Sequence, residues 1–381
     1  MEHDRHGRRD VRVLHVLNRL RASGAEVMLR AAAGQWKHHG VAADVLAVGP
    51  DPGPFAGDLR DAGYSVAHEP DASLIRVPPR LARRVRDGGY DVVHLHAERA
   101  GFYFGLAALG AGAGVVRTVH SVFGFSGMLR TQRKLQRQVL RRMGVVHVCV
   151  SPGVADNEGR RFRNPSQIIE NWCGEEFVPP TRRQRAQARQ ALELRDHHFV
   201  VISVGNCAPV KRHEAILEAV ANASGMPNLV YLHVGEEDRT GKERRLAEQL
   251  GISHQVRFLG HRHPLQALRA ADVFVMTSAF EGLPLAAVEA LMTGLPLVLA
   301  DVPGLRDVAG ASETAWLTDT GPVHLTAAIE RAANFCKSRS PTDETGLSGD
   351  RFSLRRGVAQ YAGIYHRLAR PRRGQEGEPC E

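Results

Sequence analysis

The chain has 381 residues, of which 43% are hydrophobic, and a formal net charge of +9. This length suits about two domains of ordinary size, each with its own core. No apolar run approaches the ~20 residues that a membrane-spanning helix needs, and the charged first ten residues lack a secretory signal pattern. The composition therefore argues against an integral membrane protein and against a secreted one.

Cysteine usage indicates a reducing compartment. The five cysteines are odd in number and never occur in C-x2-C spacing, so neither a disulfide framework nor a zinc site is expected. We therefore expect a cytoplasmic protein. The cysteines are Cys149, Cys173, Cys207, Cys336 and Cys380.

Short, valine-rich apolar runs alternate with helical patterns along the chain, which predicts an α/β fold with parallel sheets wrapped by helices. After the first run, VRVLHVL, a Ser23-Gly24 loop leads into a helix from about Ala25. The strands predicted in the first half lie at 11–17, 43–48, 91–95, 115–119 and 145–150. Those of the second half lie at 199–205, 229–234, 256–259, 272–276, 296–300 and 314–317.

A polar, arginine-rich stretch at 178–197 separates the halves and is expected to hold a linker and a first helix. We therefore predict one domain over 1–177 and a second over 198–351. Residues 352–370 have apolar side chains at helical spacing, and 371–381 are expected to be a disordered tail. The apolar face of that last helix comprises Val358, Tyr361, Ile364, Tyr365 and Leu368.

Two carboxylates, Glu281 and Glu289, lie eight residues apart across a predicted junction of loop and helix. Pro284 is expected at the first helical position. The free N–H groups of Leu283 and Leu285 would then point out of the helix N-terminus, where a diphosphate is well accommodated. Beside it, Glu281 would accept hydrogen bonds from sugar hydroxyls, and Glu289 from ribose hydroxyls. Spacing alone favours a plainer interpretation, a charge at the start of a helix and a solvated glutamate.

The residues around the two glutamates change that balance. SAFEGLPLAAVEALMTGLPLVLAD follows a predicted strand and precedes another, and it resembles the E-x7-E region of glycosyltransferase family 4, the retaining nucleotide-sugar enzymes. The resemblance implies the GT-B fold, in which two Rossmann-like, doubly wound parallel-sheet domains face a central cleft. The first domain would bind the acceptor and the second the donor, with the C-terminal helix crossing back onto the first.

The second half contains further residues of this resemblance. The stretch 203–220, SVGNCAPVKRHEAILEAV, resembles the strand, turn and helix in which a lysine, here Lys211, reaches the donor diphosphate. The family usually has an arginine after the first glycine, where this chain has Asn206, and Arg212 is a loosely expected substitute. The resemblance implies a donor site at Gly205, Asn206, Lys211, Arg212, Gly235, Phe258, Gly282, Leu283, Pro284, Leu285 and Glu289.

The first half resembles the family at its loops. Ser23 and Gly24 hold the place of a glycine-rich turn at which backbone N–H groups meet a phosphate or the acceptor. His120 follows a strand at the edge where open α/β sheets hold their sites, and the resemblance implies that it bonds the donor sugar. Asn171 matches an asparagine expected to line the cleft.

His94 and His96 share one face of their predicted strand, because side chains at i and i+2 point the same way. A metal pair is conceivable. No third ligand follows nearby in the sequence, however, so packing beneath the acceptor site is the favoured interpretation.

The resemblance implies retaining transfer by front-face attack, with a diphosphate oxygen taking the proton of the acceptor hydroxyl. Glu281 would orient the sugar, Lys211 and the helix N-terminus would stabilise the leaving group, and His120 would hold the sugar. No D-x-D triad occurs, so we expect catalysis with neither metal nor cofactor. The expected reaction moves a UDP- or GDP-linked sugar to a glycan or lipid-linked acceptor in cell-surface polysaccharide or glycolipid synthesis.

Two alternatives stay open. A non-catalytic protein of the same fold could bind nucleotide sugars or partners, with Asn206 as a sign of lost activity. A nucleotide-sugar epimerase of the same fold is disfavoured by the context of the two glutamates. The retained side chains Glu281, Glu289, Lys211 and His120 favour the transferase.

A basic amphipathic helix is predicted over 128–143. In one interpretation it holds the protein against anionic lipid at the inner face of the plasma membrane; a solvated charged face explains it equally well. A second basic cluster within 80–86 favours the membrane. A nucleic-acid partner is not expected, because no aromatic stacking platform accompanies the charge. The basic side comprises Arg130, Lys134, Arg137 and Arg141, and the apolar side Leu135, Val139 and Met143.

Overall fold

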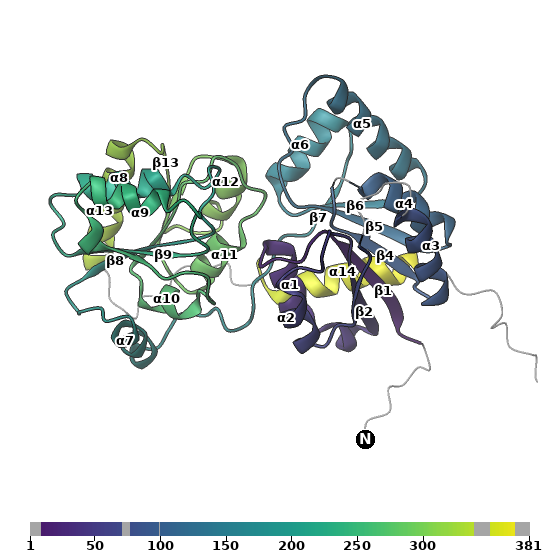
Figure 1. The fold of residues 1–381 in the computed structure, drawn as a ribbon, viewed down its shortest axis with the longest axis horizontal. Helices are drawn as coiled ribbons and strands as arrows, with labels where there is room; N and C mark the ends of the chain where they lie inside the picture. The colour runs from purple at the N-terminus through teal and green to yellow at the C-terminus, as the bar shows by residue number, and fades with distance from the viewer. Residues whose placement is uncertain (1–8, 71–76, 99, 339–350, 370–381) are drawn as a thin grey trace, which may run out of the picture. The chain divides into compact units, whose positions relative to one another are not determined.

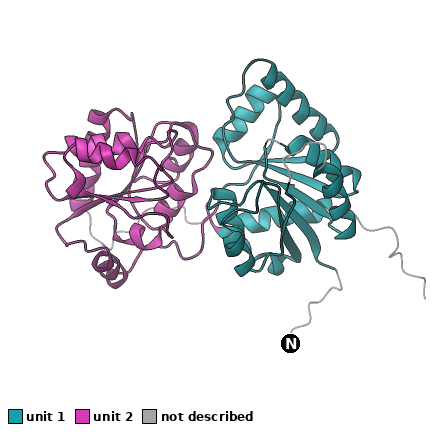
Figure 2. Cartoon of the chain, viewed as in Figure 1, with its two compact units in different colours: residues 1–170, 354–381 teal, residues 171–353 magenta. Residues whose placement is uncertain are grey.

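The computed structural model describes residues 9–70, 77–98, 100–338 and 351–369. The chain forms two compact units, which Figure 2 colours separately. Unit 1 comprises Met1–Glu170 and Leu354–Glu381, and unit 2 comprises Asn171–Ser353. Each unit has its own parallel sheet with helices packed around it (Figure 1).

The sheet of unit 1 has seven strands in the order β3-β2-β1-β4-β5-β6-β7. The strand order reverses at β1, because β1 pairs in parallel with β2 on one side and with β4 on the other. Such a reversal is where open α/β sheets place their sites. The strands are β1 (Val11–Leu17), β2 (Val41–Ala47), β3 (Val66–His68), β4 (Val92–Leu95), β5 (Gly114–Val119), β6 (Val146–Cys149) and β7 (Gln167–Ile168).

The helices of unit 1 include one from the far end of the chain. That helix, α14, spans Leu354–Leu368 and buries Val358, Tyr361, Ile364 and Tyr365, as the apolar spacing predicted. The others are α1 (Gly24–Ala32), η1 (Trp36–His39), α2 (Ala56–Asp61), α3 (Val77–Asp87), α4 (Gly101–Gly110), α5 (Gly127–Arg142) and α6 (Pro152–Phe162).

Unit 2 repeats the plan with six parallel strands in the order β10-β9-β8-β11-β12-β13. Its strands are β8 (Phe199–Val204), β9 (Leu229–Val234), β10 (Val256–Phe258), β11 (Val273–Met276), β12 (Leu297–Ala300) and β13 (Ala315–Thr318). Its helices are α7 (Arg182–Ala191), α8 (His213–Asn222), α9 (Lys242–Gln249), η2 (Ser253–Gln255), α10 (Leu265–Ala270), α11 (Leu285–Met292), α12 (Pro303–Ala309) and α13 (Pro322–Ser338).

The predicted α/β class with two parallel sheets is confirmed, whereas two details of the prediction differ. The units divide after Glu170 rather than near 178. The side-chain amide of Asn171 bonds to the Leu283 carbonyl, and Arg269 donates to the Glu176 carbonyl, so this segment is tied to unit 2. Strands β3 and β7 were not predicted. The expected disordered tail, 371–381, lies outside the described residues.

Helix α5 differs from the prediction at Arg137. Arg137, predicted on the exposed basic side, is only 2% exposed, and it donates to Glu158 over 2.7 Å and to Glu98 over 2.9 Å. Leu135, predicted on the apolar side, is 60% exposed, and Met143 of the same side is exposed as well. Because a buried guanidinium needs paired carboxylates, Glu98 and Glu158 decide which side of the helix faces inward.

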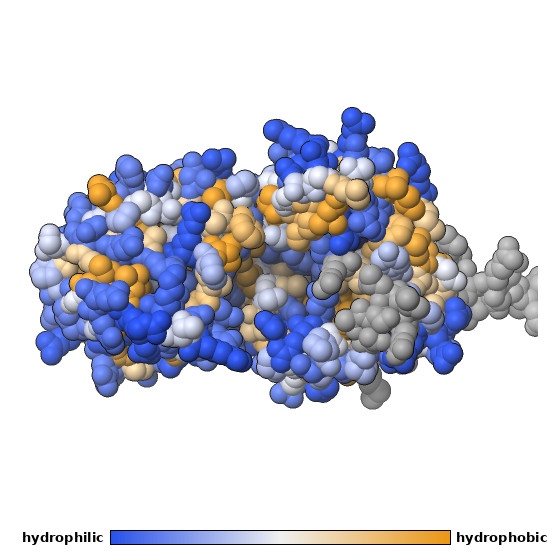
Figure 3. All heavy atoms as spheres, turned by 45° about the horizontal axis from the view of Figure 1, so that its top comes forward, coloured by the Kyte–Doolittle hydropathy of each residue, from blue (hydrophilic) through white to orange (hydrophobic). Residues whose placement is uncertain are grey.

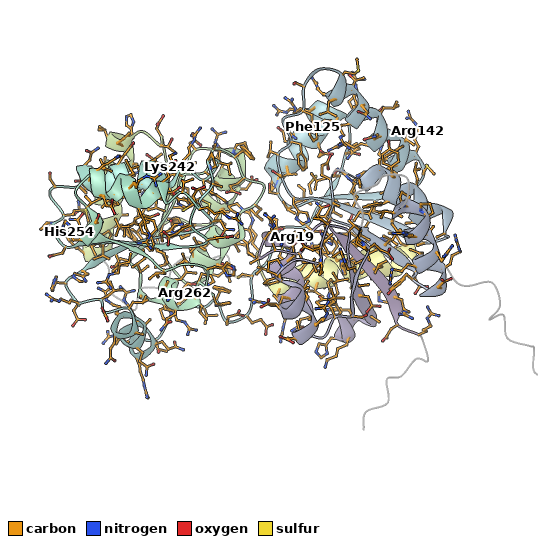
Figure 4. All side chains as sticks on the ribbon, viewed as in Figure 1. Arg19, Phe125, Arg142, Lys242, His254 and Arg262 are labelled. Carbon is orange, nitrogen blue, oxygen red and sulfur yellow. The ribbon has the colours of Figure 1, made fainter. Side chains whose placement is uncertain are left out.

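The surface of α5 therefore combines apolar and basic side chains. Met128 and Leu129, in its first turn, are exposed beside Arg130, and Arg142 extends outward at its far end in Figure 4. Figure 3 colours one face of the molecule by residue hydropathy and shows hydrophobic residues in orange among hydrophilic ones in blue. Among the described residues, the longest apolar helical stretches fall short of a membrane span.

Candidate functional site

The turn after β11 carries Glu281 and leads into α11. Pro284, expected at the first helical position, is instead the N-cap, with φ −71° and ψ 119°, and the helix begins at Leu285. Helix ends often differ from a sequence-based prediction by one residue. The first N–H groups of α11 have no partner within the helix, so the turn places Glu281 near a helix N-terminus.

Gly304, which the sequence analysis missed, supports this turn from α12. A Cβ on Gly304 would lie 2.3 Å from the Gly282 carbonyl oxygen and 2.6 Å from that of Glu281. Real Cβ atoms do not approach oxygen so closely, so only glycine fits without displacing the turn. The Pro303-Gly304 pair at the start of α12 is the one sequence signal of this contact.

Lys211 and Glu281, both predicted site residues, form an ion pair. The Lys211 Nζ lies 2.6 Å from the Glu281 Oε1, and both side chains are partly exposed. They come from loops 70 positions apart in the chain. The structure therefore brings together a cation suited to a phosphate and a carboxylate suited to hydroxyl groups.

Backbone contacts fix the loop of Lys211 against the end of β11. The Thr277 hydroxyl lies 2.9 Å from the carbonyl oxygens of Lys211 and Arg212, and the Ala279 N–H donates to the Val210 carbonyl over 2.8 Å. These bonds hold the two loops in register before any ligand binds. Such preorganisation stabilises developing charge without a later rearrangement.

Asn206 and Arg212 contact other loops than the one that holds Glu281. The Asn206 Oδ1 accepts from the Glu236 N–H over 2.9 Å, which ties the loop after β8 to the loop after β9. Arg212 caps α8 in a left-handed conformation, with φ 52°, and its guanidinium lies 3.4 Å from the Thr320 hydroxyl. Within the part of the chain that the structure describes, neither side chain bonds to Lys211.

The predicted glycines of the donor site pack against each other. A Cβ on Gly235 would lie 2.2 Å from the Gly205 carbonyl oxygen, and Gly235 has a φ of 154°. The buried His233, which the sequence analysis missed, lies with its Nε2 2.9 Å from the same oxygen and must donate to it. Phe258, at the end of β10, has the Arg244 guanidinium 4.7 Å from its ring centre. Backbone atoms therefore dominate this edge of the sheet.

Asn171 and Glu289 belong to the same unit as Glu281. The Asn171 amide donates to the Leu283 carbonyl over 2.6 Å, so this residue, expected in the acceptor domain, steadies the turn beside α11. Glu289 lies on α11 and is buried. Leu283 and Leu285, on either side of Pro284, are buried too.

In unit 1, Ser23 and Gly24 begin α1 as expected, and a buried acid lies beside them. Ser23 is the N-cap, and its hydroxyl donates to the Glu26 carboxylate. Burial raises the pKa of the Glu26 carboxyl. The S-x-x-E spacing of a capping box could have identified Glu26 from the sequence.

His120 belongs to a cluster of four histidines at the reversal point of the sheet. The Nδ1 of His15 lies 3.1 Å from the Nε2 of His96, and the Nδ1 of His96 lies 2.9 Å from the Nε2 of His120. His94 bonds instead to the hydroxyls of Tyr365 and Thr118, each over 2.7 Å. The predicted shared face of His94 and His96 is thus confirmed.

No third histidine lies near His94 and His96 in the sequence, but the fold brings one beside them. In the fold, His15 on β1 lies directly opposite His94 on β4, and ligand atoms of His15, His94 and His96 lie within 4.8 Å of one another. Strand pairing thus supplies a neighbour from 79 positions away in the chain.

Burial keeps these imidazoles neutral. It lowers the pKa of His15 to about 3, and burial followed by the nearby Arg117 charge lowers that of His120 to about 4. Burial, with the neighbouring histidines, holds the pKa values of His94 and His96 well below their usual range. At neutral pH each ring therefore has one N–H donor and one acceptor.

Comparisons with known proteins agree along most of the chain. The family described as "Glycosyl transferases group 1" matches residues 184–344, and the one described as "Glycosyltransferase Family 4" matches residues 22–173. The first match lies in unit 2. The second covers most of the unit 1 sheet.

Two curated relatives transfer sugars. An Escherichia coli UDP-Gal:alpha-D-GlcNAc-diphosphoundecaprenol alpha-1,3-galactosyltransferase is 29% identical over 239 residues, which is 59% of this chain and 61% of the relative. A D-inositol 3-phosphate glycosyltransferase of Mycolicibacterium gilvum is 28% identical over 325 residues, covering 71% of this chain and 73% of the relative. The crystal structure of Anabaena HepE with UDP and glucose has a TM-score of 0.78 at 18% identity, covering 94% of this chain and 100% of that one.

Proposed function

Because the chain belongs to the family 4 glycosyltransferases with the GT-B fold, we propose that it transfers a sugar from a nucleotide-sugar donor with retention of configuration and without a metal ion. The observation that carries the proposal is the Lys211–Glu281 ion pair beside the start of α11. A cation, a carboxylate and free backbone N–H groups are the groups that a sugar diphosphate requires.

In the proposed reaction the diphosphate takes the Lys211 ammonium and the N–H groups of α11. Glu281, released from Lys211, accepts hydrogen bonds from sugar hydroxyls and orients the ring. His120 is proposed to bond a hydroxyl of the donor sugar. The bond between the anomeric carbon and the diphosphate oxygen breaks, the acceptor oxygen bonds to that carbon on the same face, and the acceptor proton passes to the departing diphosphate.

We propose a UDP-linked donor and a lipid-linked acceptor, with a GDP-linked donor and a glycan acceptor as alternatives. The galactosyltransferase relative is named for UDP-Gal and a diphosphoundecaprenol acceptor, and the HepE neighbour was crystallised with UDP. An acceptor of that kind resides in a membrane. The exposed Met128, Leu129 and Leu135 of α5, beside Arg130, suit adsorption to the anionic inner face of the plasma membrane.

The deciding experiment is a melting-temperature panel with UDP, GDP, ADP and their sugar conjugates, with and without a chelator. One nucleotide sugar should raise the melting temperature of the wild type regardless of chelator, and Lys211→Ala should abolish the shift. Lys242→Ala is the matched control, because Lys242 also pairs with a glutamate, Glu214, elsewhere in unit 2. A stabilising ligand should then support transfer to a lipid-diphosphate-linked sugar, and Glu281→Gln should slow that transfer.

Two outcomes would favour the alternatives. If millimolar nucleotide sugars leave the melting temperature unchanged, a non-catalytic protein becomes the better interpretation, and Asn206→Arg is the variant to examine next. If a nucleotide sugar binds and is converted to its epimer without acceptor, the protein is an epimerase. A shift that disappears with chelator contradicts metal independence.

A further inference from the structure

We propose that His96, held in turn by His15, is a positioning residue for His120 and fixes the tautomer in which the Nδ1 of His120 donates a hydrogen bond to the substrate. The proposal rests on the proposed function only in placing His120 against the substrate. The hydrogen-bonded chain itself is a property of the free protein.

The geometry makes His96 the central member of this chain. Its Nε2 faces the Nδ1 of His15 at 3.1 Å, and its Nδ1 faces the Nε2 of His120 at 2.9 Å. Both ring nitrogens of His96 are therefore engaged, and the Nδ1 of His120 is the nitrogen that the chain leaves available. Strand register explains the arrangement, because β1, β4 and β5 are neighbours and their successive strand ends present these rings on one face.

One proton per ring makes the chain directional. If His96 donates from Nδ1 to His120, it must accept at Nε2 from His15, and the proton of His120 must reside on Nδ1. If the direction reverses, all three protons shift to the other nitrogen. A substrate at His120 therefore meets either a donor or an acceptor, and His15 at the far end takes part in the choice.

The surroundings of His15 favour the direction in which His15 donates to His96 and His96 donates to His120. The Nε2 of His15 is buried and has no hydrogen-bond partner. Buried N–H donors without an acceptor are rarer in proteins than acceptors without a donor, so we assign the proton of His15 to Nδ1. His120 then presents Nδ1–H, which suits an oxygen of a sugar, and the low dielectric around the chain strengthens that bond.

A metal site built on the same cluster is disfavoured by the contacts of the described residues. Both nitrogens of His94 are taken by hydroxyls, and both of His96 by imidazoles. Of the three rings that could share an ion, only His15 offers an unengaged nitrogen. A bound metal would have to break several of these hydrogen bonds, whereas the hydrogen-bonded row of histidines keeps all of them.

The test compares two substitutions at the same position in the full-length protein. The amide of asparagine lies about where Nδ1 lies in histidine, and that of glutamine lies closer to Nε2. His96→Asn therefore keeps a donor toward His120, and His96→Gln keeps only the contact with His15. If His96 merely fills space, the larger glutamine should be the milder change. The proposal predicts the reverse.

The first readout is the tautomer of His120, measured in the free protein by long-range ¹H–¹⁵N correlation of selectively ¹⁵N-labelled histidine and assigned with His120→Asn. Wild type and His96→Asn should show the proton on Nδ1, and His96→Gln a mixture of tautomers. A wild-type His120 protonated on Nε2, or an identical signal in both variants, overturns the proposal. So does stoichiometric zinc bound through His15 and His96 in the purified protein.

The second readout is transfer. His96→Gln should lose about ten- to a hundredfold more kcat than His96→Asn, with KM for the donor little changed, because misplacement of a contacting group acts on the transition state. His15→Asn, which keeps a donor at the Nδ1 position, should match His96→Asn, and His15→Leu should match His96→Gln. If the tautomer responds as predicted and no donor is turned over, the inferred role of the hydrogen-bonded histidines holds and the proposed function fails.

Discussion

At the scale of single residues, the turn of Glu281 in unit 2 depends on atoms that have no reactive chemistry. Gly304 lies beneath the turn of Glu281, and the Asn171 amide bonds to the Leu283 carbonyl in the same turn. The proposed site residues Lys211 and Glu281 are therefore positioned by backbone contacts. A displacement of this turn would move Glu281, which pairs with Lys211.

Gly304→Ala should displace this turn, since its Cβ would lie 2.3 Å from the Gly282 carbonyl oxygen. We expect a loss of about 1–3 kcal/mol in the free energy of unfolding, together with weaker donor binding in a titration of the melting-temperature shift. Gly159→Ala is the control, because no atom lies within 4 Å of a Cβ at that helical position. Equal effects of the two substitutions would show that the contact at Gly304 is unimportant.

At the scale of elements, α5 shows how buried charge orients a helix. Arg137 is buried because it donates hydrogen bonds to Glu98 and Glu158, and this orientation of the helix leaves Leu135 exposed. The helix therefore exposes apolar side chains next to basic ones, which is the composition of a membrane-surface helix.

Leu135→Glu should weaken binding to vesicles of anionic phospholipid by roughly five- to tenfold, because it removes a side chain that would be buried in the interface. It should leave the melting temperature unchanged, since Leu135 is 60% exposed. Co-sedimentation measures the bound fraction. Val323→Glu is the matched control, an exposed apolar residue on helix α13 of unit 2; an equal loss for both variants would contradict docking through α5.

The sequence predicted the strands whose residues are buried along their whole length. It did not predict contacts between residues that lie far apart in the chain. Strand β8, FVVISV, is apolar except for Ser203 because both of its faces are covered, so it was predicted. The short strands β3 and β7 have no fully buried residue and give no such signal. Glu281 and Lys211 were identified by resemblance, but their contact depends on the packing of two loops. His15 joined the histidine cluster only through the strand order.

At the scale of the whole molecule, buried neutral histidines make stability depend on pH. His15, His94 and His147 of unit 1 and His213 of unit 2 are buried, and burial is the largest cause of their lowered pKa values. The unfolded chain binds protons at these positions near pH 6.5, whereas the folded chain does not. Stability is therefore greatest above pH 6.5 and is lost as the pH falls toward about 3, the pKa of His15, His147 and His213.

Urea denaturation at pH 7, 6 and 5 should show this loss, with a slope approaching about 1.4 kcal/mol per pH unit for each such histidine. Unit 1 contains five such histidines, with His96 and His120, and unit 2 contains two, with His233, so the transition of unit 1 should shift more. His213→Asn should flatten only the slope of unit 2. Stability independent of pH over this range would mean that the histidines protonate in the folded state.

The return of α14 to unit 1 sets the order in which the protein can be completed during synthesis. Unit 2 is encoded entirely between residues 171 and 353, and its main apolar cluster draws only on that segment. Unit 1 lacks Tyr361 and Tyr365, which lie against His94, until the ribosome has translated the last helix. The unit that is begun first is thus finished last, and a nascent chain that stalls after residue 353 would carry a finished unit 2 and a unit 1 with part of its core exposed.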